Sequence, residues 1–278
     1  MINFNGELLT QTPTALENNR AFLYGDAVFE TVRVLDGRVI FAEDHYFRLM
    51  ASMRVLRMEI PMNFTMEYME EQIIALTATL GSAAARARLT FYRNSGGFYL
   101  PTDNNTQFII TAQPLDQNLY VLNQAPYEVD LYKDFHVSRQ LLSTLKSTNR
   151  LIQVTGSIYA HENGLNNCLV LNDAKNVAEA LQGNLFMFMG NVLTTPPLTD
   201  GCLNGIMRKQ VLALAQKIEG IEVKEASISP FELQKADELF ITNVINGIQP
   251  VTKYRKKEFK NTIATELVKR LNAKIRFS

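Results

Sequence analysis

The sequence predicts an α+β protein made of two domains. Strand and helix patterns do not alternate regularly in either half of the 278-residue chain, which argues against a doubly wound parallel sheet. A proline-bounded segment of different composition, 114–126, separates the two halves. We therefore expect an N-terminal α+β domain over residues 1–114, a linker over 115–126 and a C-terminal α+β domain over 127–278.

The N-terminal half carries strand patterns around two helical ones. Asp36-Gly37 has apolar residues on both sides and is a hairpin signal, and Gly81 is a suitable C-cap for the second helix. The predicted elements, in order, are a strand over 22–34 with a break at Gly25-Asp26, helices over 42–58 and 65–80, and strands over 86–92 and 107–112.

The C-terminal half mixes the two patterns in a less regular order. The predicted elements are a strand over 127–132, a helix over 147–162, strands over 168–171, 185–189 and 192–195, a helix over 205–218, a strand over 236–242 and a helix over 262–271. The first of these helices matters for function, because it would begin directly after Lys146.

Composition excludes several classes of protein. The chain has 28 basic and 28 acidic residues, and this balance suggests no nucleic-acid or membrane partner. Its two cysteines, Cys168 and Cys202, form no CxxC pair, which argues against a disulfide scaffold and fits a reducing cytoplasm. No signal-peptide pattern is found, and no apolar run reaches the roughly 20 residues that span a bilayer. The three histidines lack metal-ligand spacing, so no metal centre is expected.

Lys146 lies in Leu-Lys-Ser-Thr-Asn-Arg-Leu, a polar, hydroxyl-rich segment before an amphipathic helical pattern. A lysine at the start of a helix would have a lowered pKa, because the positive end of the helix dipole disfavours the ammonium. A neutral amine is what Schiff-base chemistry requires. The plain alternative is one surface charge among many.

Glu179 lies among small and apolar residues, in Val-Ala-Glu-Ala-Leu. Such a carboxylate is costly to bury alone, so it either faces water at a strand edge or pairs with a cation. A protonated pyridine nitrogen is one such cation, and the pair would keep a cofactor ring an electron sink.

Two further features suit a phosphate group. Gly205 opens an amphipathic helix pattern, and free backbone N–H groups at a helix start attract anions. Arg48, in Glu-Asp-His-Tyr-Phe-Arg-Leu, offers a guanidinium fork for phosphate, although an exposed helix arginine is the commoner case. An amine, a carboxylate and a glycine-led helix start are together the parts that hold pyridoxal phosphate.

These parts occur in an order that resembles the class IV aminotransferases, the fold type IV pyridoxal-phosphate enzymes. That group contains branched-chain aminotransferases, D-amino-acid aminotransferases and aminodeoxychorismate lyase. The resemblance runs from Asn5-Gly6 to Pro250-Val251 and depends on Tyr-Gly-Asp-Ala-Val-Phe-Glu-Thr-Val-Arg (24–33), His-Tyr-Phe-Arg-Leu (45–49), Lys-Ser-Thr-Asn-Arg-Leu (146–151), Glu179 with Asn-Leu-Phe (184–186), Thr-Pro-Pro-Leu (195–198), Gly-Ile-Met-Arg (205–208) and Ala-Asp-Glu-Leu-Phe (236–240).

The resemblance implies a two-domain fold like that of D-amino-acid aminotransferase, with the active site between the domains and pyridoxal 5'-phosphate as cofactor. It also implies a homodimer that acts on a small-molecule amino substrate. It assigns the Schiff base and proton transfer to Lys146, the ring nitrogen to Glu179, the phosphate to Arg48, Ile206, Met207 and Val244, and the substrate side to Phe29, Arg88, Ile245 and Asn246.

The chain departs from many transaminases around the phosphate. Met207 and Val244 stand where those enzymes have threonine, so two hydroxyl contacts are missing. Thr242 or Asn243 could compensate for them, or the site would bind the cofactor more weakly.

The sequence leaves the reaction between alternatives. Asn149-Arg150 and the run Asn-Gly-Ile-Met-Arg at 204–208 most resemble aminodeoxychorismate lyase, which belongs to folate biosynthesis. That reading, elimination of pyruvate from 4-amino-4-deoxychorismate to give 4-aminobenzoate, is slightly favoured. The alternative is a transaminase of branched-chain or other amino acids with 2-oxoglutarate. A cofactor-free binding protein that kept the fold is a third reading, and Lys146, Glu179 and Arg48 argue against it.

Overall fold

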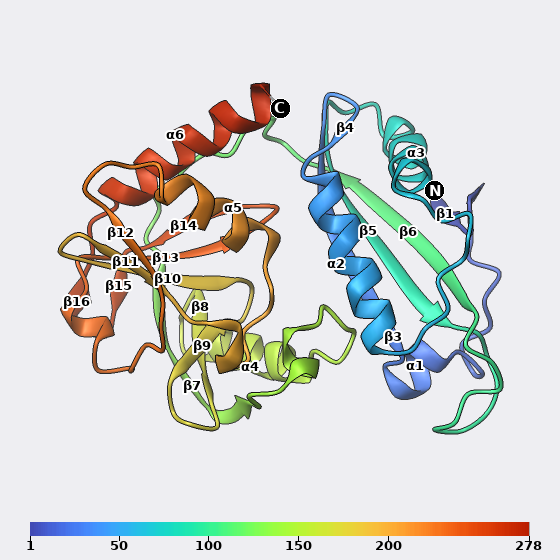
Figure 1. Cartoon of the computed structure of the whole chain (residues 1–278), viewed down its shortest axis with the longest axis horizontal. Helices are drawn as coiled ribbons and strands as arrows, with labels where there is room; N and C mark the ends of the chain where they lie inside the picture. The colour runs from blue at the N-terminus through green and yellow to red at the C-terminus, as the bar shows by residue number, and fades with distance from the viewer. Residues whose placement is uncertain (278) are drawn as a thin grey trace. The chain divides into compact units, whose positions relative to one another are not determined.

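The structure is a computed structural model that describes residues 1–277. By its contacts the chain divides into two compact units. The N-terminal unit contains Met1–Asn118 together with Lys146–Asn149, and the C-terminal unit contains Leu119–Leu145 and the chain from Arg150 onward. Both units combine sheets with helices, so the predicted α+β class is confirmed (Figure 1).

The N-terminal unit is built on one antiparallel six-stranded sheet, with the strand order β2-β1-β6-β5-β3-β4. An apolar core joins one face of this sheet to the two longer helices of the unit. The elements are β1 (Ile2–Phe4), β2 (Glu7–Leu9), α1 (Arg20–Tyr24), β3 (Ala27–Leu35), β4 (Arg38–Val39), α2 (Ala42–Val55), α3 (Met66–Ala78), β5 (Ala84–Arg93) and β6 (Thr106–Pro114).

Residues 22–24 form the end of a short helix, where the sequence predicted the start of a strand. Two capping groups explain the difference. The Asn19 side chain accepts a hydrogen bond from the Phe22 N–H, and Gly25 ends the helix in the left-handed conformation with φ of 63°. Strand β3 begins only after this turn, at Ala27.

The C-terminal unit contains two five-stranded sheets, with the orders β12-β11-β10-β13-β14 and β16-β15-β7-β8-β9. Apolar side chains from both sheets share one buried core, to which Leu131 and Leu169 contribute from one sheet and Leu185 and Ile241 from the other. The strands are β7 (Glu128–Val137), β8 (Asn167–Asn172), β9 (Val177–Ala180), β10 (Asn184–Met189), β11 (Val192–Thr195), β12 (Glu222–Glu225), β13 (Glu238–Asn243), β14 (Gly247–Val251), β15 (Lys253–Tyr254) and β16 (Lys257–Glu258).

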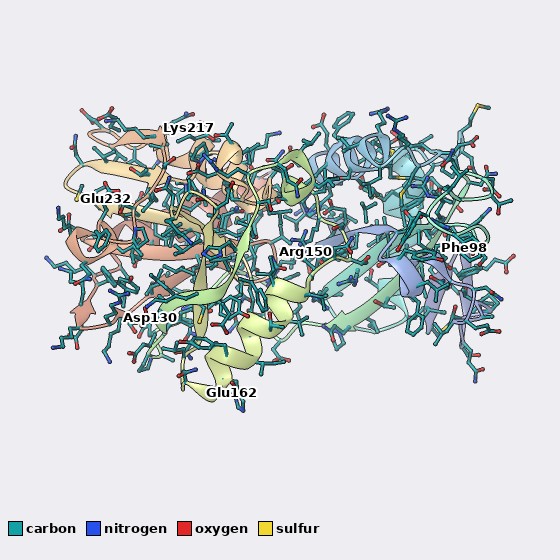
Figure 2. The ribbon with its side chains drawn as sticks, turned by 90° about the horizontal axis from the view of Figure 1, so that it is seen from below. Phe98, Asp130, Arg150, Glu162, Lys217 and Glu232 are labelled. Atoms are coloured by element: carbon teal, nitrogen blue, oxygen red, sulfur yellow. The ribbon has the colours of Figure 1, made fainter. Side chains whose placement is uncertain are left out.

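The helices of the C-terminal unit are α4 (Leu151–Glu162), α5 (Ile206–Ala215) and α6 (Thr262–Phe277). Figure 2 labels Arg150 and Glu162 at the two ends of α4. Short 3-10 turns cover Leu141–Thr144, Leu198–Asp200 and Leu233–Lys235. Within residues 1–277, no helix has the length and apolar character needed to cross a bilayer.

The helix predicted over 147–162 begins only at Leu151, because the segment before it is hydrogen-bonded to β3. The Lys146 carbonyl accepts a hydrogen bond from the Phe29 N–H at 2.8 Å, and the Thr148 N–H donates to the Ala27 carbonyl at 3.0 Å. These bonds commit the main chain of the segment to the edge of β3. The expectation that Lys146 stands at a helix start is therefore wrong, and a helix dipole does not explain its chemistry.

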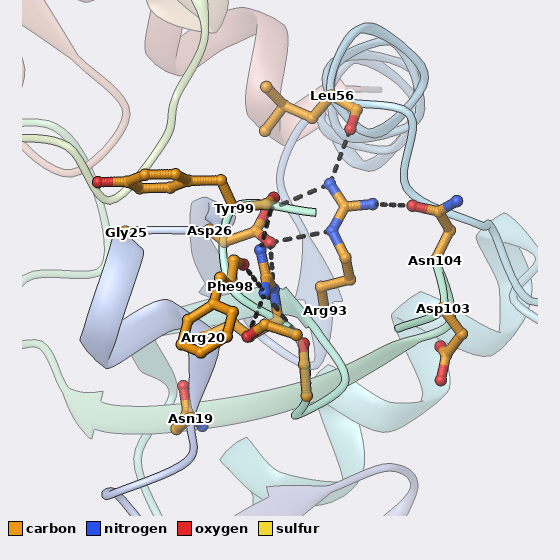
Figure 3. Close-up of polar contacts among 12 residues, drawn as sticks. Asn19, Arg20, Gly25, Asp26, Leu56, Arg93, Phe98, Tyr99, Asp103 and Asn104 are labelled. Carbon is orange, nitrogen blue, oxygen red and sulfur yellow. Dashed lines mark hydrogen bonds and ion pairs between the residues drawn. The ribbon is translucent and has the colours of Figure 1, made fainter. Parts of the chain in front are cut away.

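A buried ionic cluster in the N-terminal unit is centred on Asp26 (Figure 3). Its Oδ2 accepts hydrogen bonds of 2.9 Å from Nε of Arg20 and from Nε of Arg93. Arg20 also donates to the carbonyls of Gly96 and Phe98, and Arg93 donates to the carbonyls of Leu56 and Arg57. One carboxylate thus supports two guanidinium groups that fix the loop after β5 and the end of α2. Burial alone would raise the pKa of Asp26, but Arg93 and Arg20 hold it below its ordinary value.

We expect Asp26→Asn to lower the free energy of unfolding by about 2–3 kcal/mol, because it leaves two buried guanidinium groups without their counter-charge. Denaturant unfolding followed by circular dichroism measures the change. Asp173→Asn is the matched control. It removes an equally short pair with Arg139 in which both side chains are about half exposed, so the unfolding midpoint should stay close to wild type. Equal losses of unfolding free energy in the two variants would contradict the role of Asp26 as the counter-charge of Arg20 and Arg93.

Candidate active site

In the N-terminal unit, two basic residues that the sequence singled out lie against the aromatic ring of a third, Phe29. The Lys146 Nζ lies 4.6 Å from the centroid of the Phe29 ring, and the Arg88 guanidinium carbon lies 3.6 Å from the same centroid. The register of β3 and β5 explains this meeting. Phe29 is opposite Thr90 and Thr31 is opposite Arg88, so all four side chains point to one face of the sheet. The result is an amine and a guanidinium against one buried ring.

Arg48, the predicted phosphate ligand, is held by a carboxylate that sequence reasoning did not select. Its Nε donates to Glu30 Oε1 at 2.7 Å and its Nη2 donates to Glu30 Oε2. Both side chains are buried, so Arg48 is not the exposed helix arginine of the alternative reading. A glutamate inside a fully buried apolar strand is the signal that could have identified Glu30, because the same argument selected Glu179.

His45 completes the Glu30 cluster. Its Nδ1 lies 2.7 Å from Glu30 Oε2, and its Nε2 is buried with no hydrogen-bond partner among residues 1–277. Burial lowers the pKa of His45, and the charges of Arg48 and Lys146 lower it further against the effect of Glu30. The imidazole is therefore neutral, and its Nδ1–H donates to the carboxylate.

Glu30 keeps its charge in this buried site. Burial would raise its pKa, but the charge of Arg48 and the hydrogen bond from His45 lower it from 4.5 to about 2. The N-terminal unit thus contains a fixed anion that orients the Arg48 fork.

In the C-terminal unit, Glu179 lies on β9 and is only 5% exposed, which excludes a glutamate that faces water. Its Oε2 accepts a hydrogen bond from the Leu203 N–H at 2.8 Å, and its Oε1 is 3.4 Å from Nε2 of Gln153 on α4. These two donors are neutral amides. A protonated ring nitrogen is a cation that a buried carboxylate of this kind can bind.

The start of α5 lies in the same part of the C-terminal unit. Leu203 donates its N–H to Glu179, and its carbonyl accepts from the Asn184 side chain at 2.8 Å. A Cβ on Gly205 would lie 2.0 Å from Oδ1 of that asparagine, so a larger residue would have to displace the Asn184 side chain. Gly205 caps α5 without a side-chain hydrogen bond. The first N–H groups of the helix, those of Ile206 and Met207, are of the kind that binds phosphate.

Of the two residues considered above, Thr242 has a buried hydroxyl with no hydrogen-bond partner in the described chain. The Asn243 side chain is engaged by the protein, because its Oδ1 accepts from the Ile245 and Asn246 N–H groups and its Nδ2 donates to the Gln182 carbonyl. Compensation for the hydroxyl contacts missing at Met207 and Val244 therefore stays a prediction.

Taken by unit, the donor sets fit pyridoxal phosphate. The N-terminal unit groups Lys146, Phe29 and Arg88, with Arg48 held on Glu30. The C-terminal unit links a buried carboxylate to an uncapped helix start through the main chain of Leu203. Val244 and Ile245 are half-buried and Asn246 is exposed in the hairpin loop between β13 and β14.

Lowering the pH should remove the stabilisation that Glu30 provides. The folded-state pKa of Glu30 is about 2, below its ordinary 4.5, so its contribution is complete above about pH 4.5 and is lost as the pH falls through about 2. We expect Glu30→Gln to unfold with about 3 kcal/mol less free energy at neutral pH, and the gap to close in acid. Urea titrations from pH 7 to pH 2 measure it.

Glu70→Gln provides the control for the sign of this effect. Burial and the charge of Glu67 raise the pKa of Glu70, so removing this acid should not cost stability as the pH rises. If the difference in unfolding free energy between wild type and Glu30→Gln stays constant down to pH 2, the Glu30 charge is not what stabilises the cluster.

Comparison with known proteins gives one consistent result. A family model described as amino-transferase class IV matches residues 27–254. A putative branched-chain-amino-acid aminotransferase of Methanocaldococcus jannaschii is 31% identical, over 93% of this chain and 88% of its own. A D-alanine aminotransferase of Listeria monocytogenes is 31% identical, over 84% and 80%. The crystal structure of a putative 4-amino-4-deoxychorismate lyase from Legionella pneumophila superposes with a TM-score of 0.84 and 26% identity, covering 95% of this chain and 96% of that one.

The match to the family model extends over most of the chain and includes β3, Lys146, Glu179 and the start of α5. The solved structure from Legionella pneumophila has the same fold as this chain. The chain therefore belongs to the class IV aminotransferase family, whose members are pyridoxal-phosphate-dependent enzymes.

Proposed function

We propose that this enzyme transaminates an amino acid, with Lys146 as its catalytic residue. The observation that carries the proposal is the grouping of the Lys146 amine and the Arg88 guanidinium against the Phe29 ring. A substrate with an amino group and a carboxylate on the same carbon needs both groups close together. The guanidinium would bind the carboxylate while the amine works at the α-carbon.

Pyridoxal phosphate, when bound, supplies an electron sink for the charge that develops at the substrate α-carbon. In our proposal Lys146 binds the cofactor and then moves a proton at that carbon. Glu179 keeps the ring nitrogen protonated, and Arg48 with the Ile206 and Met207 N–H groups holds the phosphate. Phe29, Val244, Ile245 and Asn246 line the cofactor and substrate side, together with Arg88.

The choice between transaminase and lyase changes once the structure is considered. The preference for the lyase depended on Asn149-Arg150 and on the run Asn-Gly-Ile-Met-Arg at 204–208. The Asn149 side chain donates to the Gly25 carbonyl at 3.1 Å, and Arg150 donates to the Leu145 carbonyl. These hydrogen bonds fix the main chain around Lys146, so a structural role accounts for both residues. The aminotransferase relatives at 31% identity then favour transamination, of branched-chain or other amino acids with 2-oxoglutarate.

Elimination of pyruvate from 4-amino-4-deoxychorismate, giving 4-aminobenzoate, is the second candidate. The likeness to the Legionella pneumophila protein supports it, as does the similarity of residues 146–151 to that group. Both candidates include a cytoplasmic homodimer as part of the proposal.

Replacing Lys146 by alanine should remove the cofactor's covalent attachment. We expect the purified wild-type protein to absorb near the violet edge of the visible range and to lose that band on borohydride reduction, with the cofactor then fixed to the chain. Lys146→Ala should lack both properties, while Lys269→Ala, which changes an exposed lysine of α6, should keep them. Retention of borohydride labelling in Lys146→Ala would reject Lys146 as the attachment site.

A paired assay decides between the two reactions. One arm supplies amino acids with 2-oxoglutarate and measures glutamate, and the other supplies 4-amino-4-deoxychorismate and measures pyruvate. Transamination predicts glutamate without pyruvate. Pyruvate release without glutamate would replace the first candidate by the second, and absence of both products would refute the proposed function.

A further inference from the structure

Tyr120 lies in the segment that the sequence predicted to be a linker, yet it is buried in the C-terminal unit with 3% of its surface exposed. Its main chain is fixed to α6 by two hydrogen bonds with Asn272, one of 3.0 Å from the Tyr120 N–H and one of 2.7 Å to its carbonyl. Its hydroxyl donates to the Val244 carbonyl at 2.7 Å. The segment therefore reaches the hairpin loop between β13 and β14, residues 244–246.

The ring of Tyr120 also packs on the end of this loop. A Cβ on Gly247 would lie 2.6 Å from the ring, and Gly247 has φ of +72°, so glycine is required there for space and for conformation. A glycine in the left-handed region is the usual closing residue of such a short hairpin loop. The loop and the tyrosine thus fit each other closely.

The hydrogen bonds of the loop hold one peptide group from both sides. The carbonyl of the Val244–Ile245 peptide accepts from Tyr120, and the N–H of the same peptide donates to Asn243 Oδ1 at 3.0 Å. In a trans peptide these two groups point in opposite directions, so a rotation of the peptide plane would break both bonds. The neighbouring Asn246 N–H donates to the same Asn243 oxygen at 2.9 Å.

We propose that Tyr120 is a positioning residue for substrate recognition, because it fixes the Val244–Ile245 peptide and with it the loop 244–246. This inference rests on the proposed function, in which the loop lines the cofactor and substrate side. A fixed loop presents one arrangement of main-chain groups to the substrate and needs no ordering when the substrate binds. Losing the Tyr120 hydroxyl should weaken substrate binding and leave the chemical step of the bound substrate largely unchanged.

The test uses Tyr120→Phe, which removes only the hydroxyl, with two further variants of the full-length protein. Asn243→Ala releases the N–H end of the same peptide. Tyr254→Phe is the matched control, because Tyr254 is fully buried in the same unit and its hydroxyl has no hydrogen-bond partner among residues 1–277. Circular dichroism and thermal melting establish that each variant is folded.

The first readout is amide hydrogen exchange of the peptide that spans the loop, measured on the protein without substrate. A lost neutral hydrogen bond should speed exchange at Ile245 by about fivefold in Tyr120→Phe and in Asn243→Ala. Tyr254→Phe should leave it unchanged. If the Ile245 amide of Tyr120→Phe exchanges at the wild-type rate, the proposal is wrong, whatever reaction the enzyme catalyses.

The second readout is steady-state kinetics with the best amino substrate found in the paired assay. We expect KM to rise about fivefold in Tyr120→Phe, with kcat and the affinity for pyridoxal phosphate within about twofold of wild type. Faster exchange with an unchanged KM would overturn the role in substrate recognition. If the wild-type protein turns over no amino substrate, the proposed function is refuted. The wild-type assay comes first, so this outcome is separate from any result with the variants.

Discussion

The hydrogen bond from the Phe29 N–H to the Lys146 carbonyl is the contact on which the N-terminal part of the site depends. It makes the segment 146–149 a short extra partner of β3, although the residues on both sides of the segment belong to the C-terminal unit. Because the main chain of Lys146 is fixed by this hydrogen bond, the base of its side chain does not move. Phe29 provides both the N–H that holds the Lys146 main chain and the ring that lies near its amine, which fixes the distance between amine and ring.

Ion pairing and hydrogen bonding hold three polar side chains of the N-terminal unit together. Glu30 is the anion of the N-terminal unit and Arg48 its bidentate partner, and the neutral His45 donates from a third direction. In the proposed function Arg48 holds the cofactor phosphate, and a guanidinium already oriented by a carboxylate loses little side-chain freedom when an anion binds. Removing one partner of a buried ion pair is costly, but replacing the whole pair by apolar residues is often neutral, so orientation is the better physical reason for keeping this one.

The sequence predicted the fold class, the family and the cofactor, and comparison confirmed them. It predicted the long elements well because periodic apolar patterns determine them, as in α2 and α3. It failed where a few local hydrogen bonds outweigh the pattern, at the Asn19-capped helix before Gly25 and in the extended segment after Lys146. It did not select Glu30, although a glutamate in a buried strand is a sequence signal, and it did not select Tyr120, whose partner Val244 is distant in the chain. The division into domains at 114 and 127 and the roles of the site residues stay predictions.

In the proposed cofactor site of the C-terminal unit, Leu203 contacts both the group for the ring and the group for the phosphate. Its N–H donates to Glu179, and its carbonyl accepts from Asn184, whose side chain lies against Gly205 at the start of α5. The spacing between the ring end and the phosphate end of a bound cofactor would therefore depend on the main chain of Leu203 together with these two side chains. Substitutions elsewhere in the pocket would then change the substrate while the accepted cofactor stays the same.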